Sequence, residues 1–386
     1  MGGLDKVLYS PALRMKAGEL GGVRELASDV AAYILPRFIV PPLAERDDTH
    51  PELFASDEAA QVGAVPDVGA ILARHWCDRR AFIDLTHLID ECGRDSLAIW
   101  LPKVFTRARS MHVQGIPMAM LSDLGVAEIE GFKAAINPGD SLKFGICVRS
   151  GDMVGPGFGV ALTIALERLG LKVNDCAIIA DFFDSDFSLP EHVAPIIGGA
   201  LELLQDLGPW QQIIFQGTYY PEKNPADHGS SMLWPRNEWA AWRQAVKFDP
   251  ATAEHMIFGD YAADCAKMVF GGSGAAAIRH YRYTTETAWL VERGAKSGSD
   301  KEIMQDVCSR IVASGHFAEA DFSTADAYIY ATAKGLEGPG NSTTWRQINT
   351  THHITRVVVD VAKVRGIAIT RRPAGPVASQ LTLLPL

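Results

Sequence analysis

The chain has 386 residues and a formal net charge of −10 at pH 7, with 47% hydrophobic and 21% charged residues. These fractions are ordinary for a globular protein, and no segment reaches the roughly 18–20 apolar residues of a membrane span, which argues against a membrane protein. The acidic balance argues against sequence-independent nucleic-acid binding, because such binding relies on a basic surface that displaces counterions.

The N-terminal segment and the cysteines indicate a cytoplasmic protein. MGGLDKVLYSPALRMK lacks a basic region followed by an apolar stretch and a small-residue cleavage site, so secretion is not expected. The six cysteines form no Cys-x-x-Cys pair, and Cys147 and Cys176 fall inside apolar runs that read as strands. Buried thiols in a reducing compartment fit this pattern.

Eight short apolar runs recur before residue 262, mostly separated by stretches with helical spacing. The runs lie at 7–14, 34–40, 81–86, 115–121, 142–149, 176–183, 211–219 and 256–261. Apolar strands that alternate with amphipathic helices are typical of a parallel sheet covered by helices. Eight units of roughly 25–40 residues favour an α/β fold of the (β/α)8 type, the TIM barrel, over an open sheet.

Helices and loops are expected between these runs. The helical stretches lie at 18–31, 68–77, 102–110, 126–135, 159–170, 189–207 and 234–246. Trp234, Trp239 and Trp242 are expected on the last of them, packed in the core. The acidic, proline-punctuated segment 43–66 and the polar connection 221–235 predict loops over one end of the barrel.

The regular alternation ends after Tyr261. Residues 278–283 and 287–292 alternate in polarity around a Thr-Thr-Glu turn, which predicts a β-hairpin laid onto the barrel. Three further helices are expected, at 300–314, 323–334 and 350–364. We therefore expect a barrel at 1–276 and a C-terminal extension at 277–386, packed as a single compact unit.

A parallel barrel carries its chemistry at the carboxyl ends of its strands, so polar residues there are the first candidates. They are Lys16, Glu19, Arg37, Asp84, Arg149, Asp181, Asp184, Asp186, Gln216, Tyr219, Asp260 and Asp264. A mouth ringed by both signs of charge suits a charged small molecule. The competing interpretation is structural, because such side chains also form stabilising salt bridges.

Two motifs suggest a metal or phosphate site only weakly. Asp184 and Asp186 in DFFDSD are spaced to share a hard cation, to which Asp84 and Asp260 could add ligands. No His-Glu-x-x-His pattern accompanies them, so no metal is predicted, and capping of the next helix by Asp186 or Ser188 is favoured. GDMVGPGFG at 151–159 resembles a phosphate cradle, but its proline removes a donor, and a flexible loop is favoured.

The most unusual local sequence is GPGNSTTWR at 338–346, followed by two adjacent histidines. One of His352 and His353 is a candidate general base or phosphate-binding cation, with Arg346 as its partner for an anionic ligand. The alternative is a hydrogen-bonded brace in which the histidines bond to backbone and the surrounding polar residues cap or pack helices: Asn341, Thr350 and Trp345. The sequence leaves both interpretations open.

Three segments together resemble the "beta" protein family. They are Y-x-P-x-x-x-x-K-x-G-E at 9–19, R-Y-T-T-E-x-x-W-L-V-E-R-G at 282–294, and GPGNSTTWR with THHI at 338–354. The family is named after a satellite-phage protein encoded beside a host-killing gene, and its loci are regarded as antiviral defence systems. The resemblance implies a cytoplasmic barrel protein of prophages or defence islands that works with a neighbouring gene product. It supplies no agreed catalytic residues.

We therefore expect a component of a phage-defence or toxin-control locus. It would act through a protein partner encoded in the same locus, or by sensing an anionic or nucleotide ligand at the barrel mouth. The alternatives are a hydrolase or phosphodiesterase acting on a phosphorylated or nucleotide substrate, and a purely structural homo-oligomer. No cofactor is identified. The candidate catalytic residues are Asp84, Asp184, Asp260 and His353. The candidate ligand-binding residues are Lys16, Glu19, Arg37, Arg149, Tyr219, Arg282, Trp345, Arg346 and His352.

Overall fold

The chain divides into two compact units, each assembled from segments that are distant in sequence. The computed structural model describes residues 6–46, 51–54, 64–125, 128–183, 185–248, 250, 254–266 and 279–369. The first unit comprises residues 1–16, 34–219 and 237–271, and the second comprises 17–33, 220–236 and 272–386. The early segments 17–33 and 220–236 thus belong with the C-terminal part, which the sequence-based boundary at residue 276 does not anticipate.

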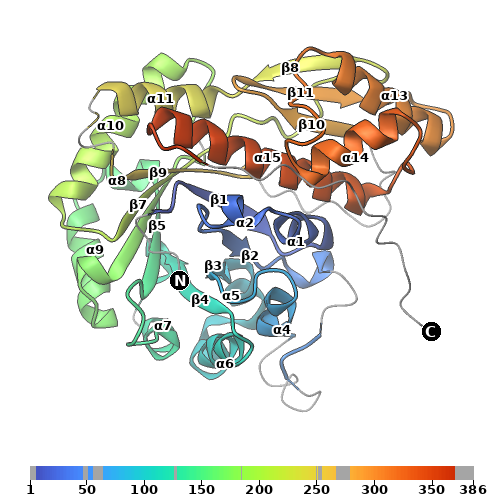
Figure 1. Cartoon of the computed structure of the whole chain (residues 1–386). Coiled ribbons are helices and arrows are strands. Elements are labelled where there is room, and N and C mark those ends of the chain that lie inside the picture. Colours follow the sequence, from blue (N-terminus) through green and yellow to red (C-terminus); the bar gives the residue numbers. More distant parts are fainter. Residues whose placement is uncertain are drawn as a thin grey trace. The chain divides into compact units, whose positions relative to one another are not determined.

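Eight parallel strands close into a barrel in the first unit, which confirms the predicted (β/α)8 fold (Figure 1). Around the barrel the strand order is β1-β2-β3-β4-β5-β6-β7-β9. The strands are β1 (Tyr9–Arg14), β2 (Arg37–Ile39), β3 (Arg80–Asp84), β4 (Gln114–Met120), β5 (Phe144–Arg149), β6 (Cys176–Asp181), β7 (Gln212–Gln216) and β9 (Met256–Asp260).

Helices surround the barrel strands, as the labels α4 to α10 in Figure 1 show. The helices of this unit are η2 (Leu43–Glu45), α4 (Val68–Ala73), α5 (Thr86–Cys92), η3 (Arg94–Ser96), α6 (Leu97–Ser110), η4 (Leu121–Asp123), α7 (Ile129–Ala135), α8 (Ser150–Met153), α9 (Phe158–Leu169), η5 (Val173–Asp175), α10 (Pro190–Asp206) and α11 (Asn237–Phe248). In α6 the residues Leu97, Leu101, Val104 and Ala108 are buried at helical spacing, so its apolar stripe faces the core.

Alternate residues of the strands fill the barrel interior. Phe82, Ile116, Ile179 and Ile214, from four different strands, belong to one buried cluster. Because side chains of a strand alternate between its two faces, the first and last residues of β3 share the inward face with Phe82. The barrel interior is therefore apolar in its middle, and β3 places a charged residue at each end, Arg80 at the first position and Asp84 at the last.

The second unit contains a three-stranded antiparallel sheet in the order β10-β11-β8. Its strands are β8 (Ser231–Pro235), β10 (His280–Thr284) and β11 (Ala288–Arg293), and its helices are α1 (Ala17–Arg24), α2 (Ser28–Ala31), α13 (Asp300–Ala313), α14 (Thr324–Ala333) and α15 (Ser342–Val364). The predicted hairpin is therefore present. The prediction that 221–235 is a loop was wrong at its end, because β8 lies there and contains Trp234, which was expected on a helix.

Two close contacts define how the segments of the second unit pack. At Gly22 of α1, an added Cβ would lie 2.6 Å from the Cβ of Thr350 on α15, so only glycine allows the helices to approach this closely. Thr351 donates a hydrogen bond to the carbonyl of Gly22 at 3.0 Å. The helix α15 begins eight residues earlier than predicted, with Asn341 as its N-cap, and Thr350 lies inside it rather than capping it.

Some finer predictions in the first unit also need correction. Residues 150–153 and 158–169 are helical, so the glycine-rich segment 151–159 is not a continuous loop. Asp186 accepts a hydrogen bond from the Ser188 N–H at 2.9 Å, but Leu189 is the N-cap of α10. In the described part of the chain, none of the helices combines the length and apolar character that crossing a membrane requires.

Candidate functional site

The carboxyl ends of the barrel strands carry a largely buried network of charged and polar side chains, which we call the mouth network. Its members are Arg37, Asp84, Cys147, Arg149, Asp181 and Tyr261. The strand register aligns two of them, because Arg149 at the end of β5 is the ladder partner of Asp181 at the end of β6. The parallel barrel thus brings together side chains that lie more than 200 residues apart in sequence.

Arg37 and Asp84 form the shortest ion pair of the network, at 2.7 Å. The Nε and Nη2 atoms of Arg37 donate to Oδ2 of Asp84 at 2.9 and 2.7 Å. The other oxygen, Oδ1, accepts from the backbone N–H and the hydroxyl of Thr86 at 3.0 and 2.7 Å. Asp84 is 2% exposed and Arg37 6%, so this carboxylate is fully bonded and out of contact with bulk water.

Asp181 is shared by four side chains of the network, one of them the Cys147 thiol, which donates to Oδ2 at 3.8 Å. Arg149 donates to its Oδ2 at 3.0 Å, and the Tyr261 hydroxyl lies 2.9 and 3.0 Å from its two oxygens. The Nη1 atom of Arg37 lies 3.7 Å from the same Oδ2. Asp181 therefore stands between two guanidinium groups, one buried and one reaching toward solvent.

The two aspartates have pKa values shifted in opposite directions. Burial by itself would raise the pKa of Asp84, but the Arg37 guanidinium and the Thr86 hydrogen bonds outweigh it and hold the pKa below its ordinary value. At Asp181 the effect of burial, which raises the pKa, outweighs the effect of the positive charges of Arg37 and Arg149, which lower it, so the pKa is raised. Two carboxyl groups in one site with divergent pKa values suit different roles, one as a fixed anion and one as a proton acceptor.

Burial also keeps the neighbouring titratable groups neutral. It raises the pKa of the Cys147 thiol to about 12, and it raises that of Tyr261, where the charge of Asp181 adds to the effect. Cys147 is therefore not an activated nucleophile. Directly after Tyr261, Ala262 and Ala263 adopt positive φ angles of 51° and 60°. Such strain in residues with a Cβ concentrates at functional sites.

Arg149 is the member of the network most accessible to a ligand. Its side chain is 35% exposed, against 7% for Arg37. Its guanidinium lies over the ring of Phe183 at 4.2 Å from the centroid, a cation–π contact that supports it at the strand end. A guanidinium edge with this support can bind phosphate or carboxylate in the bidentate manner typical of arginine.

Of the residues predicted for the mouth, Arg37, Asp84, Arg149 and Asp181 meet in the network. Asp260 is buried nearby in sequence, beside Tyr261, and it accepts hydrogen bonds from the Tyr9 hydroxyl and the Ala262 N–H. Asp184 lies outside the described residues. Two other predicted residues are bonded elsewhere, Lys16 to Glu45 at 2.6 Å, and Tyr219, through its backbone N–H, to Glu238 at 3.1 Å.

The other predicted ligand-binding residues belong to the second unit. Glu19 and Arg346 approach each other, with 3.9 Å between Oε1 and Nε. The guanidinium of Arg282 lies 4.5 Å from the ring centroid of Tyr220. Trp345 packs in the core of this unit and donates to a backbone carbonyl at 2.7 Å.

The two adjacent histidines lie in the interior of the second unit. His352 contacts Oδ2 of Asp326 through Nδ1 at 3.0 Å and the carbonyl of Thr284 through Nε2 at 2.8 Å. His353 contacts the Thr284 hydroxyl at 2.8 Å. Both are at most 1% exposed, and the ring of His352 stacks on Tyr283 at 3.8 Å. These bonds fit the brace interpretation better than a role in contact with a ligand.

Sequence reasoning missed part of the network. Asp181 was named among the strand-end candidates but was not chosen as a catalytic or ligand-binding residue, and Tyr261, Cys147 and Thr86 were not considered as site residues. The one available signal was position, since Tyr261 directly follows the last residue of the eighth barrel strand. In the described part of the chain, no group of three or more His, Cys, Asp or Glu side chains is placed to hold a metal ion.

A closed parallel barrel with charged side chains gathered at its carboxyl strand ends defines a TIM-barrel protein with a polar site at its mouth. The sequence matches the family model described as Beta protein over residues 9–359, and the chain belongs to this family. A search of curated proteins found no match.

Proposed function

We propose that this Beta family protein is a ligand-sensing component of a phage-defence or toxin-control locus, and that the barrel mouth binds a small anionic ligand. Nucleotides are the first class to test. The cellular setting follows from the family resemblance, and it includes the cytoplasm as the place of action and a protein partner encoded in the same locus. The ligand class follows from the chemistry of the mouth network.

The observation that carries this proposal is the position of Arg149. Its side chain is about one third exposed, it is supported by Phe183, and it shares Asp181 with the buried Arg37. A ligand phosphate that displaces Asp181 from Arg149 would form charge-assisted hydrogen bonds at a position partly shielded from water. The Phe183 ring beside it offers an aromatic surface for a base.

Protonation of Asp181 would release Arg149 from its ion pair with this carboxylate. Its pKa is raised by burial, so its proton affinity is higher than that of an ordinary aspartate. When an anion replaces the carboxylate as the partner of Arg149, a proton on Asp181 removes the repulsion between the two negative charges. Binding would thereby change the hydrogen bonds of Tyr261 and the segment that follows it, which is a route from ligand to conformation.

A thermal-shift screen of the purified full chain with nucleoside mono-, di- and triphosphates tests the ligand class. We expect at least one nucleotide to raise the melting temperature of the wild type and of Arg168→Gln but not of Arg149→Gln. Arg168 is an exposed arginine at the end of α9 and serves as the matched control. The absence of any shift with nucleotides, pyrophosphate or sulfate would count against an anion site at the mouth.

Co-purification tests the partner. The tagged protein, expressed from its own locus, is expected to retain a product of a neighbouring gene, and Arg149→Gln should change the retained amount if ligand and partner are coupled. A chain that retains none of the neighbouring products would contradict the partner half of the proposal. The thermal-shift result would then still decide the ligand half.

A second candidate function is a hydrolase or phosphodiesterase acting on a phosphorylated or nucleotide substrate. The divergent pKa values of Asp84 and Asp181 favour it, because they match a fixed anion paired with a proton-transfer group. Asp181→Asn keeps the shape of the side chain and removes proton transfer. Turnover of any bound nucleotide by the wild type, lost in this variant while binding persists, would establish the enzyme over the sensor.

A further inference from the structure

A pocket lies at the amino ends of strands β3 and β4, at the opposite end of the barrel strands from the mouth network. Its volume is about 550 Å³, within the range of small-molecule sites. Arg80, at its centre, is the first residue of β3, whereas Asp84 of the mouth network is the last, so about 13 Å of strand separates them. The pocket is therefore a separate feature and needs its own explanation.

The pocket has an apolar floor and a polar rim. Ile116 and Leu142 are buried in the cluster that fills the barrel, and they form the floor. The rim comes from three segments, which are the residues that lead into β3, the end of α6 with the start of β4, and the loop between α7 and β5. This combination of an apolar base and a few polar groups is the usual composition of a ligand site.

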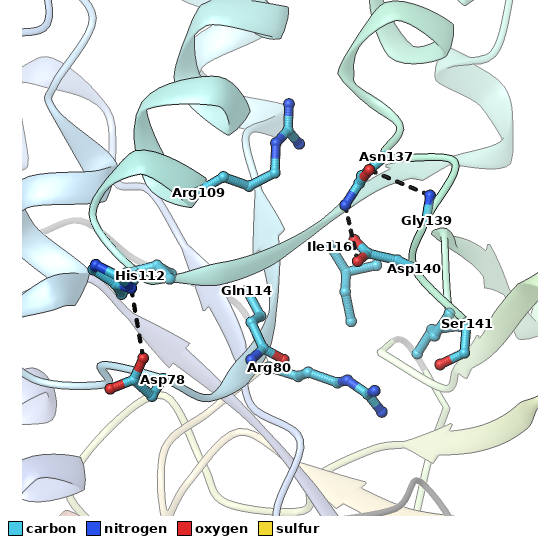
Figure 2. Close-up of a pocket in the computed structure, with 12 residues that line it drawn as sticks. Asp78, Arg80, Arg109, His112, Gln114, Ile116, Asn137, Gly139, Asp140 and Ser141 are labelled. Carbon is cyan, nitrogen blue, oxygen red and sulfur yellow. Dashed lines mark hydrogen bonds and ion pairs between the residues drawn. The ribbon is translucent and has the colours of Figure 1, made fainter. Parts of the chain in front are cut away.

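The guanidinium of Arg80 lines this pocket without a bond to any of the described residues. Arg80 is half-buried, and in the described part of the chain no hydrogen bond or ion pair reaches its guanidinium. In Figure 2 it runs from its strand toward the loop that carries Asp140 and Ser141. Gln114, its ladder partner on β4, and the Ser141 hydroxyl likewise make no side-chain hydrogen bond among the described residues. Three groups able to donate hydrogen bonds thus line one space.

The other charged residues of the pocket are already engaged. Arg109 donates to the carbonyl of Ala135 at 3.3 Å, and Figure 2 shows its guanidinium turned away from Arg80. Asp140 accepts from the Asn137 amide at 2.9 Å. Asp78 faces His112 at 3.9 Å, and its backbone N–H donates to the His112 carbonyl at 2.8 Å.

The rim contains two residues in the left-handed backbone conformation. Asp78 and His112 have positive φ angles of 56° and 60°, a left-handed conformation that is uncommon outside glycine. Both side chains are more than three quarters exposed, so neither angle serves to bury a side chain. At His112 this conformation ends α6, because the N–H of the next residue, Val113, donates to the carbonyl of Ala108 at 2.9 Å. The hydrogen bond between the backbones of Asp78 and His112 then joins the loops before β3 and β4 beside Arg80.

We propose that this pocket is a second binding site, which takes a small molecule through a phosphate or carboxylate group held by Arg80, Gln114 and Ser141. The fork of Arg80 donates to two oxygens of the group, and the amide and hydroxyl donate to the third oxygen of a phosphate or to the free lone pairs of a carboxylate. Two arginines are balanced by two aspartates in the lining, which suits a compact monovalent or divalent anion and excludes a polyanion such as nucleic acid.

The experiment is isothermal titration of the purified full chain with three probes, inorganic phosphate, glycerol 3-phosphate and succinate, at constant ionic strength. We expect at least one probe to bind the wild type, and Arg80→Gln to weaken it at least tenfold. Arg74→Gln removes the same charge from an exposed position outside the pocket and should leave affinity within twofold. Preference for the phosphates over succinate identifies a phosphoryl ligand, and the reverse preference identifies a carboxylate.

A second variant keeps the test valid if Arg80→Gln fails to fold. Gln114→Glu changes an exposed side chain and places a carboxylate beside Arg80, so it should also weaken binding at least tenfold. The proposal is overturned if none of the three probes binds, or if both pocket variants bind as the wild type does. Loss of binding in Arg149→Gln with retention in the pocket variants would also overturn it, because the probe would then occupy the mouth.

Discussion

Replacement of Arg37 by methionine is the most informative perturbation of the mouth network. Methionine keeps most of the apolar stem and removes the charge. The change deprives Oδ2 of Asp84 of two hydrogen bonds, at 2.9 and 2.7 Å, and leaves Asp181 with Arg149 and Tyr261. Breaking a buried ion pair from one side costs about 3–5 kcal/mol, because the remaining charge stays buried without its partner. We expect a loss of this size at pH 7.

The loss of stability caused by Arg37→Met is expected to depend on pH. In the wild type the pKa of Asp84 is held below its ordinary value, so its ion pair stabilises the fold above the ordinary carboxylate pKa and is lost as pH falls through the folded value. Without Arg37, burial dominates and the pKa of Asp84 rises. The cost of Arg37→Met should therefore shrink as pH is lowered from 7 toward 5.

Urea unfolding followed by circular dichroism measures these free energies, with Arg168→Met as the exposed control, expected within about 0.5 kcal/mol of the wild type. A double-mutant cycle with Asp84→Asn should give a coupling energy on the order of 2 kcal/mol, since the double variant leaves no unpaired charge. A loss below about 1 kcal/mol for Arg37→Met, or no coupling to Asp84, would refute the electrostatic account of the network.

Four further outcomes are expected. The mouth should bind inorganic sulfate more tightly as pH falls from 8 to 5.5, because the pKa of Asp181 is raised and its protonation removes a competing negative charge. Sulfate keeps the same charge over this range, so titration calorimetry reports the protein alone. An affinity that does not depend on pH would contradict this prediction. Asp326→Asn should lower the stability of the second unit by about 1–3 kcal/mol in urea unfolding, since the carboxylate is fully buried and accepts several hydrogen bonds. An unchanged free energy of unfolding would contradict the brace interpretation of the histidines. Gly22→Ala should cost about 1–3 kcal/mol, since its Cβ would overlap a threonine of α15, and an unchanged melting temperature would disprove that contact. Cys147, with its pKa raised to about 12, should react with a thiol reagent at pH 8 far more slowly than the exposed Cys77; equal rates would show that the barrel opens.

The barrel was predictable from sequence because its strands are nearly continuous apolar runs. Strands such as β6, from Cys176 to Asp181, are buried at every position, so the pattern stands out against the amphipathic helices on either side. The strand β8 was missed for the converse reason. Four of its five residues are exposed, including Met232 and Leu233, so it shows no burial pattern and its place in the sheet comes from pairing with β11.

The candidate site was predictable only as a location. Polar residues at strand ends identified Arg37, Asp84 and Arg149, because strand ends of a parallel barrel share one rim. Their pairing was not predictable, since Asp181 bonds Tyr261 eighty residues away and Tyr9 bonds Asp260 across 251 positions. Such contacts depend on how the barrel closes, and no local pattern encodes them.

The pocket at the opposite end of the barrel had no sequence signal. Arg80 opens a strand and follows another arginine, which reads as an ordinary solvated pair, and the residues that line the pocket come from three separate segments. The adjacent histidines illustrate the reverse situation. Their polarity left a functional interpretation open beside the brace, and both are buried and bonded within the second unit.

The central claim is that Arg149 binds an anionic ligand at the barrel mouth, and isothermal titration tests it most directly. The full chain, Arg149→Gln and Arg168→Gln are titrated with the nucleotide that stabilises the wild type most. The account predicts saturable binding with one site per chain, unchanged within twofold in Arg168→Gln and at least tenfold weaker in Arg149→Gln, a loss of about 1.4 kcal/mol or more. Equal affinity in all three proteins, or no binding of any nucleotide to the wild type, would contradict it.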